Sequence, residues 1–511
     1  TNATSSADFV AISLKGPANN SQAVGAKVVI FANEGIRTYE NNPARGFQSS
    51  MAIPIHIGLA NTKIDSAFLI WPDNTYTPVN LQPKQPRLSI TYQTGLPVFD
   101  YNQIRSYFKN ETRPMEDITA QTGLNYVHQE NPFIEFNREY LIPHMVSTEG
   151  PALAVADINH DGLDDVYIGS SRTFHDAIFL QQPNGRFVQT RQPNMLLDSL
   201  YESVDAKWID VNNDGHPDLV LASGGNEYYG KDEHLLPRVY LNDGKAQFTR
   251  VANAFSNIYV TQSCIAPYDF NGDGFVDLFI GGRVVPWEYG KIPQSCLLQN
   301  DGTGKFTDVT KKYSAELANI GMVTQALWFD MNKDGLNDLI VCSEWGGIDA
   351  FINAKGSFTK KVVTDKKGWW NFVLPVDINR DGNIDLIAGN LGLNSRLHAT
   401  KEEPVRLYYN DFDDNGKKEQ ILTYYLDGKE IPFANKEELQ RQMPVIKKKF
   451  LYAADFARAS LAEILSQKKL NTAQQLTADY FSSAVLINQG NLSFTTEALP
   501  WKAQLSPVRD A

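Results

Sequence analysis

The sequence predicts an all-β protein whose larger part is a β-propeller, and three observations lead to this prediction. An acidic loop of nine residues occurs six times, with oxygen-bearing side chains at positions 1, 3, 5 and 9 and glycine at position 6. Apolar, β-prone residues flank these loops, so each loop is expected to join two buried strands in a hairpin. A second pattern with a glycine turn recurs in phase and is typical of an outer hairpin. Four strands per unit, repeated around an axis, form a propeller.

Residues 1–95 contain none of these loops and predict a small separate domain. Three apolar runs, at 9–14, 26–31 and 67–71, lie between turns rich in Gly, Asn and Pro, and are expected to be strands. These strands predict a small β-sandwich-like domain. A linker is expected over residues 96–115, and the propeller over residues 116–511.

The acidic loops begin at residues 157, 210, 269, 330, 377 and 411. A hard cation such as calcium takes six to eight oxygen ligands on a sharply turned backbone. The helical calcium motif, the EF-hand, requires a bidentate Glu at position 12. Here position 12 is apolar in every loop, namely Ile168, Leu221, Ile280, Val341, Ala388 and Leu422. We therefore expect calcium loops between strands, with position 9 replacing the missing helical Glu.

The predicted calcium ligands are the side chains at positions 1, 3, 5 and 9 and the residue at position 7. Position 7 is expected to contribute its backbone carbonyl, as His216 would do in loop two. They are Asp157, Asn159, Asp161, Leu163, Asp165; Asp210, Asn212, Asp214, His216, Asp218; Asp269, Asn271, Asp273, Phe275, Asp277; Asp330, Asn332, Asp334, Leu336, Asp338; Asp377, Asn379, Asp381, Asn383, Asp385; and Asp411, Asp413, Asn415, Lys417, Glu419. About six calcium ions are expected, and their charge would balance the formal net charge of −12. The sixth loop departs most from the others, at Asn415 and Glu419.

The outer hairpins are predicted at 178–187, 239–248, 297–306, 350–358 and 485–494. Residues 427–480 separate the inner hairpin of the sixth unit from the outer hairpin at 485–494. In this stretch Phe456, Leu461, Ile464 and Leu465 have helical spacing, which predicts a helical insertion with a buried apolar stripe. Residues 503–508 read as the first strand of a seventh unit, so we expect the last blade to be incomplete in this chain.

The loops and their hairpins resemble those of the FG-GAP/VCBS repeat family, the calcium-loop propellers that also form integrin α-subunit heads. This resemblance covers residues 116–511 and implies a propeller of the seven-bladed type. The N-terminal segments 16–20, 24–28, 45–50 and 70–73 resemble an ASPIC/UnbV domain. The order of the two parts resembles large Bacteroidota surface proteins. It implies a place on the extracellular face of the outer membrane, held there through a segment absent from this chain, beside a TonB-dependent nutrient transporter and its surface lipoprotein.

In propellers of this class the loops between strands 2 and 3 lie on the face opposite the calcium loops. In this chain those loops and their neighbours carry aromatic, Arg and Asn residues, which are frequent anchors of binding surfaces. We expect them to bind a glycan, a peptide or a protein; the alternative for each Trp is packing between blades. The predicted ligand-binding residues are Arg172, Asn226, Glu227, Tyr228, Arg283, Trp287, Glu344, Trp345, Trp369, Trp370, Asn390 and Asn394.

The sequence favours a binding protein over an enzyme. It contains no H-E-x-x-H, no G-x-S-x-G and no Cys/His pair at a telling spacing. Two alternatives stay open: a calcium-dependent polysaccharide lyase, which would place basic groups such as Arg172 and Arg283 in a cleft, and a structural spacer of an adhesin, whose axial face would be plugged. The net charge of −12 argues against a nucleic-acid partner. Cys264, Cys296 and Cys342 are expected to be buried in strands.

Overall fold

The computed structural model describes residues 9–32, 35–44, 49–59, 63–82, 87–107 and 115–510. The chain divides into two compact units, Thr1–Asp117 and Ile118–Ala511, and each is described by itself. Helix α1 (Asn102–Tyr107) belongs to the first unit and lies within the range predicted to be a linker. Residues 45–48 of the ASPIC/UnbV-like segments and 108–114 of the predicted linker lie outside the described residues.

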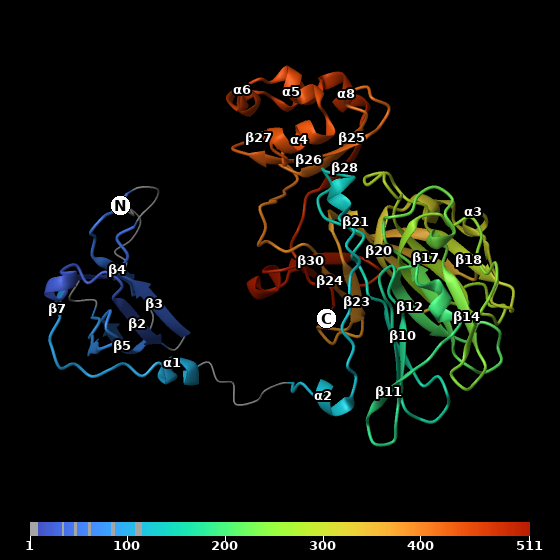
Figure 1. Cartoon of the computed structure of the whole chain (residues 1–511), viewed down its shortest axis with the longest axis horizontal. Coiled ribbons are helices and arrows are strands. Elements are labelled where there is room, and N and C mark those ends of the chain that lie inside the picture. The colour runs from blue at the N-terminus through green and yellow to red at the C-terminus, as the bar shows by residue number, and fades with distance from the viewer. Residues whose placement is uncertain are drawn as a thin grey trace. The chain divides into compact units, whose positions relative to one another are not determined.

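The first unit is built from two sheets that share one hydrophobic core (Figure 1). One sheet has the order β4-β1-β7, and the other has the order β3-β2-β5-β6. The strands predicted at 9–14, 26–31 and 67–71 are present as β1, β2 and β5, with Ala26 and Trp71 just outside the strands. The bounds are β1 Phe9–Lys15, β2 Lys27–Ala32, β3 Gly35–Glu40, β4 Ile55–Gly58, β5 Ile64–Ile70, β6 Tyr76–Pro78 and β7 Arg87–Thr91.

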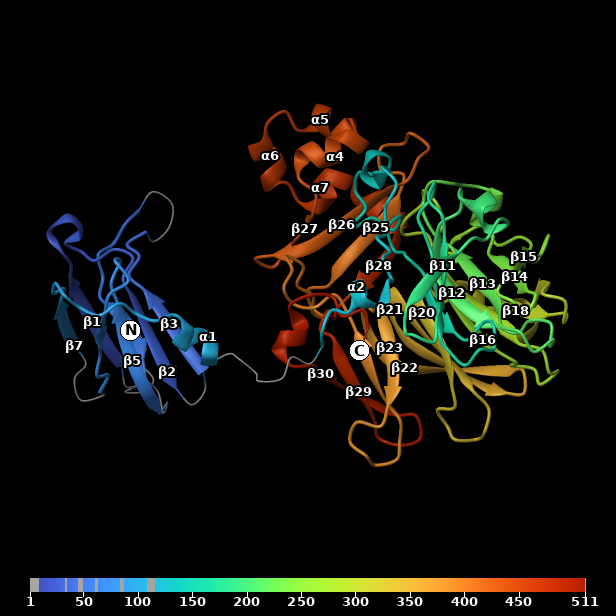
Figure 2. The same ribbon diagram turned by 60° about the horizontal axis from the view of Figure 1, so that its bottom comes forward.

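The second unit is propeller-like, with five antiparallel sheets that follow one another along the chain (Figure 2). These blades are β8 Leu153–Ala156, β9 Asp165–Ile168, β10 Ala177–Gln181 and β11 Phe187–Thr190; β12 Ser203–Ile209, β13 Asp218–Ser223, β14 Arg238–Asn242 and β15 Phe248–Arg250; β16 Thr261–Tyr268, β17 Asp277–Val284, β18 Cys296–Asn300 and β19 Phe306–Asp308; β20 Met322–Phe329, β21 Asp338–Ala354 and β22 Ser357–Trp369; and β23 Phe372–Val376, β24 Asp385–Gly389, β29 Ala484–Asn488 and β30 Phe494–Ala498. The prediction of an all-β chain of mostly four-stranded units is confirmed.

The first strands of neighbouring blades, from β8 through β12, β16 and β20 to β23, lie side by side. Separate hydrophobic clusters fill the space between the first and second, second and third, third and fourth, and fourth and fifth blades. Each blade thus buries its apolar faces against its neighbours rather than in one central core. Cys264, Cys296 and Cys342 are buried in β16, β18 and β21, as predicted.

The structure corrects the assignment of the sixth unit. The hairpin β29–β30 pairs with β24 of the fifth blade, so it is not the outer hairpin of the sixth unit. The sixth acidic loop instead lies in an additional sheet, inserted between β24 and β29 and ordered β27-β26-β25-β28. We call this sheet the inserted sheet; its strands are β25 Val405–Asn410, β26 Glu419–Leu426, β27 Lys429–Pro432 and β28 Gln474–Ala478.

Helices cover one face of the inserted sheet. They are α4 Lys436–Gln442, α5 Val445–Lys449, α6 Ala453–Arg458, α7 Leu461–Leu465 and α8 Gln467–Thr472, within the predicted 427–480 insertion. Asn435 and Ser460 start α4 and α7 with capping boxes. Leu461, Ile464 and Leu465 pack against the sheet, so the apolar stripe is core, as expected. Figure 1 shows these helices in orange and red beyond β25 to β28.

The opposite face of the inserted sheet packs on the blades and on a segment that we call the strap, residues 118–151. The strap includes helix α2 (Thr119–Thr122) and the 3-10 turn Glu135–Asn137. Ile142 and Val146 of the strap share a buried cluster with Leu407 of β25 and with Trp345 and Trp369 of the fourth blade. The strap is therefore held between the blades and the inserted sheet.

The expected first strand of a seventh unit at 503–508 is not formed. Residues Trp501–Gln504 make a 3-10 turn, and 505–510 have no strand hydrogen bonding. Instead, Gln504 accepts the backbone N–H of Leu393 and Asn390 accepts that of Val508, so this segment runs beside the fifth blade.

Candidate functional site

The six acidic loops share one backbone geometry. Glycine at position 6 has φ between +84° and +90° in all six, and a β-carbon placed there would meet no atom within 4 Å. Glycine is thus favoured at position 6 because it adopts a positive φ readily, and not because a side chain there would clash with neighbouring atoms. Its N–H donates to the position 1 carboxylate at 2.9–3.0 Å, as in Gly335 to Asp330. The position 5 side chain in turn accepts the N–H of position 7 at 2.7–3.0 Å.

The position 9 carboxylate is buried in every loop and joins the loop to its sheet. Asp338 accepts the N–H of Met331, at position 2 of the loop, at 3.1 Å. It also accepts the N–H of Asn353, in the part of β21 that takes the place of the third strand, at 2.9 Å. Asp165, Asp218 and Asp385 make the same pair of bonds. Glu419 accepts only the N–H of Phe412 among the backbone groups, at 2.8 Å.

A repeated asparagine, which the sequence analysis did not single out, connects loops one, two and three to the blade that follows each. Asn242 and Asn300 each donate a side-chain N–H at 2.8 Å to the position 2 carbonyl of the preceding loop, in Ile158 and Val211 respectively, and Asn353 does so to Phe270 at 3.4 Å. The signal was present, since these residues recur in the outer-hairpin pattern. These hydrogen bonds explain why the acidic loops and the outer hairpins recur in the same phase.

Side chains at position 4 also reach the neighbouring loop. His160, Asn213 and Lys333 each contact the position 6 carbonyl of the loop that follows, in Gly215, Gly274 and Gly382, at 3.0, 2.9 and 2.5 Å. These contacts connect loops one, two and three with one another, and loop four with loop five.

The electrostatics of the loops suit a cation. Burial, with a smaller effect of the carboxylates at positions 5 and 1, raises the pKa of Asp218 to about 6 and that of Asp277 to about 7. The pKa of Asp338 rises to about 6 for the same reasons. In loop six, burial and the carboxylates of Asp413 and Asp411 raise the pKa of Glu419 to about 7. A bound divalent cation would relieve this repulsion.

Loop six offers the tightest cluster of carboxylates. Asp411, Asp413 and Glu419 each place a ligand atom within 4.8 Å of the others, the one such group of His, Cys, Asp or Glu found among the described residues. The buried Oδ1 of Asp413 has no hydrogen-bond partner. An all-oxygen donor set with an unpaired carboxylate oxygen fits a hard cation such as calcium. Among the described residues, the loop that departs most from the repeat is thus the one that brings three carboxylates this close together.

The structure corrects the open ligand face that the sequence predicted. Asn226, Arg283, Glu344, Trp345, Trp369, Trp370 and Asn390 are buried. The strap and the inserted sheet cover this face: Asn226 donates to Glu135 and Glu139 of the strap, and Trp345 and Trp369 pack in the cluster shared with β25. Trp370 packs between the fourth and fifth blades.

The remaining predicted ligand residues are more accessible. Arg172 donates to the hydroxyl of Tyr228 at 2.9 Å and lies 3.6 Å from a carboxylate oxygen of Glu227. The side chains of Trp287 and Asn394 are exposed to solvent. These residues do not converge with the buried group on a single open surface.

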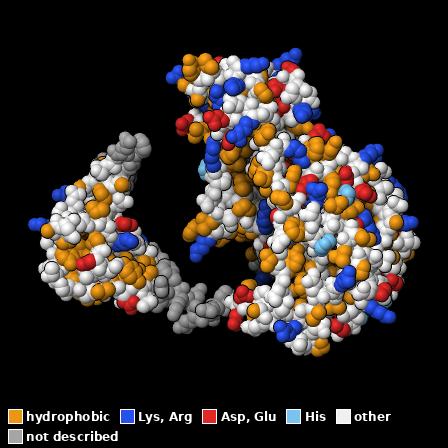
Figure 3. All heavy atoms as spheres, viewed as in Figure 1, with side chains coloured by type: hydrophobic (Ala, Val, Ile, Leu, Met, Phe, Trp, Pro, Cys, Tyr) orange, Lys and Arg blue, Asp and Glu red, His pale blue; other side chains and the backbone are white. Residues whose placement is uncertain are grey.

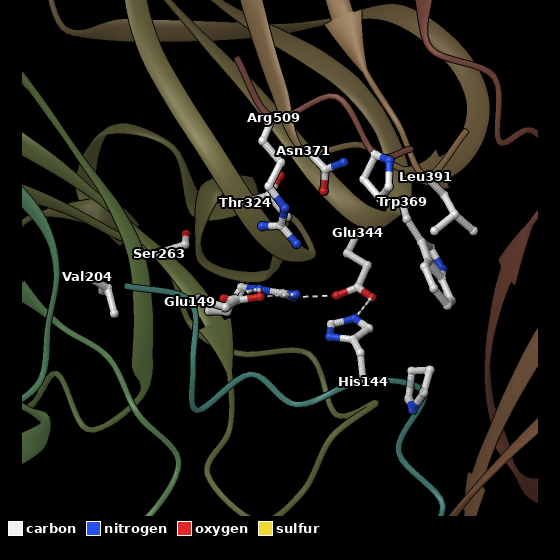
Figure 4. Close-up of a pocket in the computed structure, with 13 residues that line it drawn as sticks. His144, Glu149, Val204, Ser263, Thr324, Glu344, Trp369, Asn371, Leu391 and Arg509 are labelled. Carbon is white, nitrogen blue, oxygen red and sulfur yellow. Dashed lines mark hydrogen bonds and ion pairs between the residues drawn. The ribbon is translucent and has the colours of Figure 1, made fainter. Parts of the chain in front are cut away.

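A cavity of about 350 Å³ lies near the axis (Figure 4). Val204, Ser263 and Thr324 line it from the first strands of three blades, and His144 and Glu149 line it from the strap. Arg283 is held there by two carboxylates, Glu149 at 2.8 Å and Glu344 at 2.5 Å.

His144 and Glu344 form the second ion pair of this cavity. His144 Nε2 lies 2.6 Å from Glu344 Oε1, and Nδ1 lies 3.2 Å from the carbonyl of Met145. Both ring nitrogens face acceptors, which favours the doubly protonated imidazolium. Burial alone would lower the pKa of His144, but the Glu344 carboxylate outweighs it and raises the pKa. Burial would raise the pKa of Glu344, but Arg283 and then His144 hold it well below its usual range.

These pairings limit the chemistry of the cavity. Of its three basic side chains, Arg283 and His144 are each engaged by carboxylates, whereas Arg509 is exposed. The hydroxyl of Tyr289 also donates to Glu344 at 2.8 Å. The arrangement is suited to clamping the strap onto the third and fourth blades.

The strap carries further polar residues that the sequence analysis missed. Buried Glu135 accepts the N–H groups of Val146 and Ser147 at 2.8 and 3.1 Å. Buried Glu139 accepts the side-chain N–H of Gln420 in the inserted sheet at 2.8 Å. No sequence spacing links residues that lie this far apart in the chain, so they could not be paired in advance. In the described part of the chain, none of the helices has the length and apolar character required to cross a membrane.

Comparison with known proteins gives two family matches. Residues 16–97 match the family described as ASPIC and UnbV. Residues 157–221, 210–280 and 330–388 match the family described as FG-GAP-like repeat. No curated protein matches the chain.

Solved structures give only distant likenesses. The V. cholerae biofilm matrix protein Bap1 is 10% identical, with a TM-score of 0.28 over 68% of this chain and 66% of that chain. BBS1N in complex with ARL6DN is 10% identical, with a TM-score of 0.26 over 56% and 92%. The Bacillus licheniformis rhamnogalacturonan lyase PL11 is 10% identical, with a TM-score of 0.27 over 83% and 84%. These scores are too low to carry an argument about function.

Proposed function

Because the chain combines an ASPIC and UnbV domain with FG-GAP-like repeats, we propose that it is a non-enzymatic binding protein whose propeller-like unit is stabilised by calcium. The observation that carries this proposal is the shared geometry of the six loops, in which oxygen donors at the same four positions surround the same glycine turn. A ligand that binds only the folded state stabilises that state. Calcium would therefore serve as a structural element rather than a reactant.

The proposal includes a place on the extracellular face of an outer membrane and an accessory role beside a nutrient transporter. The order of the domains supports this part, through the resemblance to large Bacteroidota surface proteins. The captured ligand would be a glycan, a peptide or a protein. The covered axial face directs the search for its binding site to other surfaces of the unit.

Metal analysis together with thermal unfolding tests the calcium part of the proposal. We expect about six calcium ions per chain, and a melting temperature at least ~10 °C higher in 1 mM calcium than in excess EGTA, since each filled site adds its own binding free energy. Magnesium at the same concentration is the control. A purified chain that holds no calcium and melts at the same temperature in both buffers would overturn the proposal.

A further inference from the structure

We propose that a groove between the blades and the inserted sheet binds an acidic oligosaccharide, with Tyr229 and Trp287 as its aromatic platform and Lys417 and Arg441 as its carboxylate-binding groups. This inference rests on the proposed binding function and specifies the class of its ligand. It also moves the binding site away from the covered axial face.

The groove has a volume of about 880 Å³ and is larger than the axial cavity. Its walls come from seven places in the chain: 138–140 of the strap, 229–230 and 285–288 of the second and third blades, Tyr259 before β16, Tyr409 of β25, 415–420 of loop six and β26, and 441–444 at the end of α4 and just after it. Small-ligand sites usually occupy about 300–1,000 Å³ and combine apolar walls with a few polar groups. The size suits several sugar rings rather than one.

The aromatic platform is exposed and held rigidly. Tyr229 and Trp287 are 62% and 38% exposed, and their rings stack with centroids 4.0 Å apart. Trp287 has φ +68°, which bulky side chains rarely adopt, and its N–H is bound by buried Asn226 at 3.2 Å. The guanidinium of Arg138 lies 4.6 Å from the Trp287 ring centroid. Rigid aromatic rings lose little conformational entropy on binding, so they make efficient anchors.

The charge of the groove favours an anionic ligand. Three carboxylates line the groove, and each has a partner. Glu139 is paired with Arg138 at 3.2 Å, and Glu288 is paired with Lys291 and accepts the hydroxyl of Tyr409. Buried Glu419 accepts the N–H of Phe412 at 2.8 Å. Lys417 and Arg441 are exposed, and within the described part of the chain neither makes an ion pair. Planar Arg and flexible Lys are the usual partners of carboxylates.

The helical wall beside the groove is basic as a whole. Residues 436–472 contain eight Lys or Arg and four Asp or Glu, although the full chain has a net charge of −12. Figure 3 shows blue Lys and Arg side chains over these helices. A positive wall next to exposed aromatic rings suits a polymer with carboxylates and apolar sugar faces, which a peptide of mixed charge would match less well.

Isothermal titration of the whole chain in 1 mM calcium tests the proposal. The probes are hexasaccharides of hyaluronan, chondroitin and galacturonan, each with its carboxyl-reduced counterpart. We expect at least one acidic hexasaccharide to bind, and its Kd to rise about 10-fold or more in Tyr229→Ala and Trp287→Ala and about 5-fold in Arg441→Gln. Reduction of the sugar carboxylates should weaken binding about 10-fold. The matched controls are Trp501→Ala, which is 68% exposed elsewhere, and exposed Arg191→Gln; both should bind like the unaltered chain.

Tyr229→Ala and Arg441→Gln alter exposed side chains and keep the test valid if Trp287→Ala fails to fold. Binding that these two variants leave unchanged would overturn the site. Equal binding of acidic and carboxyl-reduced sugars would overturn the ligand class, and failure of all three acidic probes would overturn the proposal outright. None of these results bears on calcium-dependent melting, which tests the proposed function separately.

Discussion

The hairpins of the fourth blade and of the inserted sheet carry the same acidic loop in different surroundings. In the blade, the loop joins β20, at the edge of the sheet, to β21. In the inserted sheet, the loop joins β25 and β26, which are the two central strands. The loop sequence therefore specifies a local hairpin and a set of oxygen donors, but not the position of that hairpin in a sheet.

The chain segment on the C-terminal side of the loop decides that position. Loops two, three and four are each followed by an outer hairpin whose asparagine, such as Asn353, bonds both the position 9 carboxylate and the preceding loop. Loop six is followed instead by the short strand β27 and by helices. The next hairpin asparagine, Asn488, donates its N–H to Asp385 of loop five at 2.8 Å. The family matches likewise include loops one to five and stop before loop six.

Calcium removal should produce the largest effect and shows whether the two kinds of hairpin respond alike. Calcium at 100 times its Kd stabilises a single site by about 2.7 kcal/mol, or about 100-fold in local opening. We expect hydrogen exchange in β20–β21 and in β25–β26 to accelerate by about this factor in EGTA. Strands of the first unit, which has no acidic loop, are the internal control. A β25–β26 hairpin that exchanges equally fast with and without calcium would show that loop six is not a metal site.

Removal of the position 9 carboxylate should separate the two surroundings. Asp338→Ala leaves two buried backbone N–H groups without an acceptor, whereas Glu419→Ala leaves one. At about 1–3 kcal/mol for each unsatisfied group, the blade variant should lose about 2–6 kcal/mol and the inserted-sheet variant about half of that. Urea unfolding in EGTA measures both without the contribution of the metal. Equal losses would mean that the second hydrogen bond contributes nothing to the blade.

The strap lies between the two regions, and its ion pair predicts a pH dependence. His144 faces Glu344 directly, with Arg283, Glu149 and Tyr289 also close to the pair. Because the folded state raises the pKa of His144, its stabilising effect is full below the unfolded pKa of about 6.5 and is lost as pH rises through the folded value. Because the folded state lowers the pKa of Glu344, its contribution is kept above about pH 4.5.

We therefore expect His144→Gln to lower the melting temperature more at pH 5.5 than at pH 9, with a difference of about 2–4 °C. His175→Gln, which alters an exposed side chain, is the control and should show no such difference. A deficit of the same size at both values of pH would mean that His144 acts by packing against Tyr289 and Trp369 rather than by charge.

Local features of the molecule were predictable, and non-local ones were not. The hairpins around each loop, the strands of the first unit and the buried cysteines are encoded in short-range patterns. The pairing of β24 with β29 joins residues separated by the whole inserted sheet, and no short-range pattern encodes it. One signal was available: loops five and six begin 34 residues apart, against 47 to 61 for the other pairs, which leaves too little chain for a complete blade.

The covered ligand face has a similar explanation. Trp345 and Trp369 have glycines beside them in the sequence, in segments where an aromatic ring suits a ligand surface and a buried contact equally well. Which of the two occurs depends on the strap and on the inserted sheet, whose docking the sequence does not show. Trp287 lies in a similar loop but faces the groove, and its exposure separates it from the buried tryptophans.

The smallest expected effect tests whether the loops are locally equivalent. Gly335 and Gly416 have φ +87° and +84°, and a β-carbon at either position would meet nothing within 4 Å. Alanine at each should therefore cost the same strain of about 1–2 kcal/mol, in spite of the different sheets. Asparagine, which adopts this conformation more readily, should cost less at both sites. Urea unfolding of the four variants measures this, and a clearly larger loss at Gly335 would show that the blade restrains its loop more tightly than the inserted sheet does.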